Sequence, residues 1–90
     1  MFYLRIKDGY TLEKRENGTA VIAPDGSDTH ILLNEISEYL WELAKTGVSK
    51  TEMLNRLLDR FDISTVLALG TIDTFLKTLN GNGITENEKG

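Results

Sequence analysis

The tetrapeptide Leu32-Leu33-Asn34-Glu35 joins two kinds of secondary structure and constrains the fold more than any other feature of this chain. A short apolar run from His30 to Leu33 stops at an asparagine, and a helical pattern follows at once. Asparagine is a preferred helix N-cap, because its side-chain oxygen accepts a hydrogen bond from an otherwise unpaired N–H of the first turn. The sequence therefore predicts a strand that ends directly on the start of a helix.

Turn signals divide the residues before this junction into strands. Asn17-Gly18 is a strong hairpin signal, because both residue types tolerate positive φ. Pro24-Asp25-Gly26 is a second turn signal. Phe2 to Ile6 fits either a short strand or an extended arm. We expect an antiparallel three-stranded sheet built from Tyr10 to Arg15, Thr19 to Ala23 and Thr29 to Leu33.

Apolar residues at helical spacing predict three helices after the junction. The first runs from Glu35 to Thr46, with Gly47 just beyond its end. Ser49-Lys50-Thr51-Glu52 is a capping box that opens the second. Either Asp62 or Ser64 caps the third, which Gly81 ends. The expected buried stripes are Ile36, Tyr39, Leu40, Leu43 and Ala44, then Met53, Leu54, Leu57, Leu58 and Phe61, then Leu69, Ile72, Phe75, Leu76 and Leu79.

A small N-terminal sheet followed by three helices is typical of a winged-helix-like α+β domain. We expect one such domain over residues 1–84, with a modest core because the chain has only 90 residues. Residues 85–90 are polar, and we expect them to form a disordered, frayed tail.

Composition argues against several classes of partner. The net charge of −4 disfavours nucleic acids and anionic membranes, both of which attract basic surfaces. The chain has no cysteine, and its longest apolar runs are about four residues, far below the roughly 20 that a bilayer span requires. No signal peptide is recognisable, so we expect a cytoplasmic protein.

The side chains that carry chemistry are sparse and poorly placed for catalysis. His30 is the single histidine and has no cysteine, serine or carboxylate at a recognisable catalytic spacing. Glu35, Glu38 and Glu42 lie on one helix, where a solvated face explains them better than a metal site does. The glycine turns lack the spacing that phosphate binding needs. We therefore expect no catalytic residues, no metal and no cofactor, and a protein that is not an enzyme.

The third predicted helix carries a less ordinary strip. Gly70 lies mid-helix, where glycine costs about 1 kcal/mol relative to alanine and often marks a close approach by another backbone. Val66 lies one turn before it, Asp73 three residues after it, and Leu69 at the border. An apolar strip with a small floor indicates a groove for a partner. Packing against the protein's own sheet is an equal alternative.

Winged-helix domains often bind DNA through the third helix, so this function is the main alternative. Between Ser64 and Asn80 the one cation is Lys77, which Asp73 offsets. A recognition helix normally carries Arg, Lys, Asn or Gln toward phosphates and base edges. Two cations in the predicted hairpin are flanked by Glu13 and Glu16. The charge pattern therefore disfavours DNA binding.

Several short motifs also have an order and spacing that resemble a known family over about residues 6–84. They are Ile6-Lys7-Asp8-Gly9-Tyr10, Leu33-Asn34-Glu35, Leu40-Trp41-Glu42-Leu43, Asp73, Phe75-Leu76, Leu79 and Gly83-Ile84. Together they resemble the PqqD family, the small proteins of pyrroloquinoline quinone (PQQ) biosynthesis and their relatives.

The resemblance implies a peptide-binding function. Members of this family, also called RiPP recognition elements, hold the leader segment of a ribosomally made precursor peptide and present it to a modifying enzyme, often a radical S-adenosylmethionine (SAM) enzyme. The leader typically adds as a strand to the edge of the third strand and packs against the third helix. On this chain the implied peptide-binding residues are His30, Ile31, Leu32, Leu33, Val66, Leu69, Gly70 and Asp73.

If the leader adds to the third strand, proline substitutions at neighbouring positions of that strand should differ in their effects on folding and on peptide binding. Successive N–H groups along a strand point to opposite sides, and proline removes one of them. Ile31→Pro and Leu32→Pro should therefore differ, one breaking the sheet and the other blocking the peptide. The continuous apolar run does not fix which is which. A structural subunit or a detached enzyme domain is the third functional hypothesis.

Overall fold

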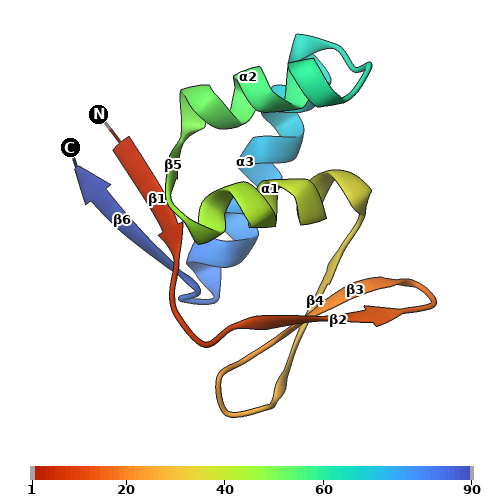
Figure 1. Cartoon of the computed structure of the whole chain (residues 1–90), viewed down its shortest axis with the longest axis vertical. Coiled ribbons are helices and arrows are strands. Elements are labelled where there is room, and N and C mark those ends of the chain that lie inside the picture. The colour runs from red at the N-terminus through yellow and green to blue at the C-terminus, as the bar shows by residue number, and fades with distance from the viewer. Residues whose placement is uncertain (1, 90) are drawn as a thin grey trace.

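The computed structural model describes residues 2–89, which form two three-stranded antiparallel sheets and three helices (Figure 1). Each helix follows a strand or a short loop, and the last strand returns to the first. In chain order the elements are β1 (Phe2–Ile6), β2 (Thr11–Arg15), β3 (Gly18–Ile22), β4 (Asp28–Leu33), α1 (Glu35–Lys45), β5 (Val48–Ser49), α2 (Lys50–Arg60), α3 (Thr65–Gly81) and β6 (Thr85–Lys89).

The predicted three-stranded sheet is confirmed, with strand order β2-β3-β4. β2 pairs with β3 from Thr11 opposite Ile22 to Arg15 opposite Gly18, which leaves a two-residue loop between them. Of the Asn17-Gly18 pair only Gly18 has a positive φ, at 143°. β4 lies at one edge of this sheet and has β3 as its neighbour there.

A second sheet, of order β5-β1-β6, corrects the prediction of a disordered tail after residue 84. β1 lies in its centre, and β6 pairs with it from Ile6 opposite Thr85 outward. The Lys7 N–H donates to the Ile84 C=O at 2.8 Å, and Arg5 and Glu86 form an ion pair at 3.0 Å. Strand pairing of this kind uses main-chain groups, so the polar residues of β6 give no apolar alternation that would reveal it in the sequence.

Side-chain caps fix the start of each helix. Asn34 accepts a hydrogen bond from the Ser37 N–H at 2.9 Å, which confirms the predicted strand-to-helix junction. Ser49 caps α2, and Ser64 rather than Asp62 caps α3, in both cases through the N–H three residues on. In the described part of the chain, none of the helices has the length and apolar character of a membrane span.

The core lies between the helices and both sheets. α1 packs against β1, β4, α2 and α3. It is therefore covered over a wider arc than the predicted stripe, and Trp41, which the stripe omits, is 1% exposed. Leu58 and Leu69 were placed in the predicted core, but each is 37% exposed, so the buried stripes of α2 and α3 are narrower than predicted.

A β-bulge interrupts β4 before it reaches α1. Between Ala20 opposite Leu32 and Ile22 opposite Asp28, β4 contains two more residues than β3. His30 lies in this bulge and has a φ of 64°, a left-handed conformation that is uncommon for a residue with a side chain. Its N–H donates to the Asp28 carboxylate at 2.7 Å. The bulge therefore interrupts the pairing of β4 with β3 between Asp28 and Leu32.

His30→Gly should be as stable as the natural chain or more stable by up to about 1 kcal/mol, because glycine adopts positive φ without steric strain. His30→Val should be less stable by about 1 kcal/mol or more, because β-branched residues disfavour that conformation. The His30 side chain is exposed, so neither change removes buried contacts. Urea unfolding compares the two variants. A valine variant as stable as the glycine variant would contradict the left-handed conformation.

Candidate functional site

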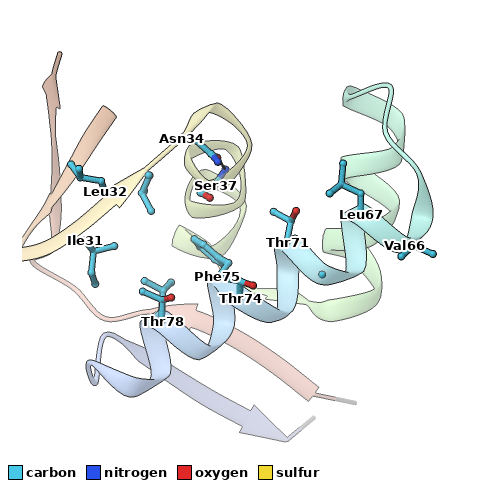
Figure 2. A pocket seen from close by; sticks show the side chains of 13 residues that line it. Ile31, Leu32, Asn34, Ser37, Val66, Leu67, Thr71, Thr74, Phe75 and Thr78 are labelled. Carbon is cyan, nitrogen blue, oxygen red and sulfur yellow. Dashed lines mark hydrogen bonds between the residues drawn. The ribbon is translucent and has the colours of Figure 1, made fainter. Parts of the chain in front are cut away.

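A cavity of about 670 Å³ lies between the C-terminal half of β4, the start of α1 and one face of α3 (Figure 2). It brings residues of the strand-to-helix junction together with residues of the third helix. Its lining consists of Ile31, Leu32, Leu33, Asn34, Ser37, Val66, Leu67, Gly70, Thr71, Thr74, Phe75, Thr78 and Leu79. We call this cavity the β4–α3 groove.

Large apolar side chains along the rim of the groove are exposed to solvent. Val66 is 82% exposed, Leu67 54% and Leu32 47%, the three highest values among the exposed large hydrophobic residues. Phe75 and Leu79 lie deeper and are buried. An apolar surface of this kind, hollowed and flanked by polar groups, is typical of a binding site for another molecule.

The groove contains hydroxyl and amide groups but no charged residue. Thr71, Thr74 and Thr78 follow one another along the face of α3 that lines it (Figure 2). Ser37 and Asn34 supply the polar groups at the α1 end. The groove is therefore neutral and is suited to neutral segments rather than to ions.

Hydrogen bonds at the far end of the β3–β4 pair show which way the backbone groups of β3 point. The Ala23 N–H donates to the Ser27 C=O at 2.9 Å. The Val21 C=O accepts a hydrogen bond from the Thr29 hydroxyl at 2.7 Å. The odd-numbered residues of β3 therefore direct their backbone groups toward β4, since alternate residues of a strand point to opposite sides.

The same alternation defines the open edge of β4. Thr19 is an odd-numbered residue of β3 and lies opposite Leu33, so the backbone groups of Leu33 point toward β3. Those of Leu32, one residue earlier, point the other way. Since β4 is the last strand of its sheet, the N–H and C=O of Leu32 face the open edge beside the groove.

The structure brings together five of the eight residues predicted for the site. Three come from β4 and two from α3, and all of them line the groove: Ile31, Leu32, Leu33, Val66 and Gly70. A Cβ added at Gly70 would meet nothing within 4 Å, so this residue opens the groove rather than approaching another backbone.

The other three predicted residues lie outside the groove. His30 is in the bulge. Leu69 and Asp73 lie on a neighbouring part of the α3 surface, and the Asp73 carboxylate pairs with Lys50 at 2.6 Å. Of the predicted strip, Val66 and Gly70 thus line the groove and Asp73 does not, because the lining follows the adjacent stripe of α3 that carries Thr74.

Sequence reasoning missed the centre of the α3 face. The groove follows Leu67, Thr71, Thr74 and Thr78, which have the i, i+4, i+7, i+11 spacing of one helical stripe. Three threonines on one stripe of an otherwise apolar helix were the available signal. Asn34, which caps α1, also lines the groove, although only its capping role was predicted from the sequence.

Charged groups gather instead around the β2–β3–β4 sheet. The Arg15 guanidinium and the His30 N–H both bond the Asp28 carboxylate, and in that order they hold its pKa below the usual range. Glu38 accepts a hydrogen bond from the Thr19 hydroxyl at 3.0 Å and pairs with Lys14 at 3.6 Å. Among the residues the structure describes, no group of three or more His, Cys, Asp or Glu could hold a metal ion.

The fold and groove define a small α+β domain that offers an open strand edge beside a neutral, largely apolar groove. The family model for coenzyme PQQ synthesis protein D (PqqD) matches residues 19–84, which is most of the chain. The protein therefore belongs to the PqqD family, and the predicted resemblance is confirmed. No curated protein and no solved structure matches the chain. Family membership links it to PQQ-type biosynthesis and to the recognition of precursor peptides.

Proposed function

We propose that this protein is a cytoplasmic, non-catalytic chaperone that binds the leader segment of a ribosomally synthesised precursor peptide and presents the peptide to a modifying enzyme. The observation that supports this most is the outward-facing N–H and C=O of Leu32 beside the neutral β4–α3 groove. An extended peptide that joins a strand edge gains main-chain hydrogen bonds, and pockets for alternate side chains supply specificity.

The proposed binding mode needs no catalytic group. The leader extends the β2–β3–β4 sheet by pairing with Leu32, and its inward side chains contact Phe75 and the threonines of α3. The partners that the family resemblance favours are the precursor peptide and a radical SAM enzyme. Binding of the leader leaves the rest of the precursor available to that enzyme.

The proposal is tested by calorimetric titration with a candidate precursor peptide chosen from the genes that neighbour the one for this protein. Two synthetic halves, leader and core, are titrated separately. We expect the leader to bind and the core to show no heat of binding. Binding of the core alone, or of neither half, would contradict the proposed function.

A winged-helix protein that binds DNA is the alternative function, and the charges of α3 oppose it. Asp73 and Lys77 are its two charged residues, and Asp73 is paired with Lys50. We expect no appreciable affinity for duplex DNA at physiological salt, because phosphate contacts by cations supply most of such affinity. Fluorescence anisotropy with random and genomic duplexes measures it. Submicromolar, salt-sensitive binding would favour the DNA-binding function over the peptide-binding one.

A further inference from the structure

We propose that the segment this protein recognises is short and uncharged, pairs with β4 only around Leu32, and directs at least one hydroxyl or carboxamide side chain at the threonines of α3. We call Thr71, Thr74 and Thr78 the threonine track. The proposal rests on the function proposed above and specifies the chemistry of the peptide that fits the site.

The length of the paired segment follows from the neighbours of Leu32 along the edge. His30 would be the next residue to face outward, but its N–H is already bonded to Asp28 at 2.7 Å and its φ is 64°. On the other side, the Asn34 C=O accepts the first bond of α1, from the Glu38 N–H at 2.8 Å. Of these three residues, Leu32 is the one that can both donate and accept at this edge, so an added strand leaves the sheet after a few residues.

The absence of charge from the peptide follows from the lining. None of the residues that line the groove is charged. On the neighbouring surface of α3, Asp73 is held in an ion pair with Lys50. A charged side chain placed in the groove would lose hydration without gaining a partner, which is unfavourable.

The polar preference follows from the threonine track. Within the described part of the chain, the three hydroxyls have no hydrogen-bond partner, although their residues line the groove. A bound segment that covers these groups must supply partners for them, because polar groups buried without a hydrogen bond destabilise a complex. Serine, threonine, asparagine and glutamine can do so without bringing charge.

The test selects short peptides from a random display library on the 90-residue chain and removes those that still bind the Leu32→Pro variant. We expect the retained peptides to share a short uncharged stretch with a hydroxyl or carboxamide residue. Affinities of one retained peptide are then compared for Thr74→Val, which replaces the hydroxyl with a methyl group of similar size, and for Thr51→Val, an exposed position on α2 outside the groove.

Thr74→Val should weaken binding about three- to tenfold, the effect of one lost hydrogen bond, and Thr51→Val should leave it unchanged. Thr71→Val and Thr78→Val extend the series along the track. This inference is wrong if the retained peptides carry charged residues in the shared stretch, or if none of the three threonine variants weakens binding. Neither result contradicts strand addition at β4. If every selected peptide also binds the Leu32→Pro variant, the proposed function is wrong as well. The two kinds of result therefore separate a failure of this inference from a failure of the proposed function.

Discussion

Leu32→Pro should leave the stability of the protein nearly unchanged and remove most of its affinity for the leader, whereas Leu33→Pro should destabilise the fold strongly. The two residues are neighbours on β4, but their N–H groups point in opposite directions. That of Leu33 faces β3 opposite Thr19, and that of Leu32 faces the open edge. The register therefore resolves which position in the apolar run is outward, a point that the sequence left open.

The expected magnitudes differ accordingly. Proline at Leu33 removes a ladder hydrogen bond and a side chain that is 4% exposed, which should cost about 4 kcal/mol or more of a typical domain stability of about 5–15 kcal/mol. Proline at Leu32 removes an unpaired donor and a half-exposed side chain. It should lower leader affinity at least tenfold, since about 1.4 kcal/mol corresponds to a factor of ten.

An alanine variant at Leu32 separates the effect of the lost N–H from the effect of the lost side chain. Leu32→Ala keeps the N–H and should bind the leader more tightly than Leu32→Pro does. Thermal melts and calorimetric titration measure both properties. A Leu32→Pro protein that folds and binds the leader as the natural chain does would exclude strand addition at β4.

Gly70→Leu should raise the stability of the protein and abolish most leader binding. Gly70 lies in the interior of α3, where leucine is the better helix former by roughly 0.8 kcal/mol. A Cβ added at Gly70 would meet nothing within 4 Å, and the residue lines the groove, so the leucine side chain should project into the groove. Stability and affinity should thus change in opposite directions, which a general structural disturbance would not produce.

Lys77→Leu is the matched control, because Lys77 is exposed on the same helix and does not line the groove. It adds the same side chain to α3 without filling the site. We expect its leader affinity to remain within about twofold of the natural value, a difference of less than 0.5 kcal/mol. Equal losses of affinity in Gly70→Leu and Lys77→Leu would remove Gly70 from the binding site.

Local chemistry made the first sheet and the helix starts predictable. Asn34, Ser49 and Ser64 each have a short polar side chain directly before a helical pattern, and each caps its helix in the structure. The hairpin before them is marked by glycine turns. These signals act within a few residues, so they do not depend on how the elements pack.

The features that escaped prediction depend on contacts distant in sequence. β6 forms by pairing with β1, and its own residues are polar, so its sequence has no apolar strand pattern. Trp41 is buried because α1 is enclosed by elements on more than one side. The threonine track becomes recognisable only once the side of α3 that faces β4 is known. Helical periodicity defines stripes on a helix, but it does not assign one of several stripes to a particular neighbour.

The position of β1 between β5 and β6 has a consequence for the biosynthesis of the protein. Leu4 and Ile6 belong to the core, yet their partners on one side are Asn87 and Thr85. Pairings between residues so far apart in sequence form late, because a long loop must close first. During translation the groove residues, from Ile31 to Leu79, emerge from the ribosome before β6 does. The first strand therefore remains without one of its two neighbours until the last residues of the domain have been synthesised.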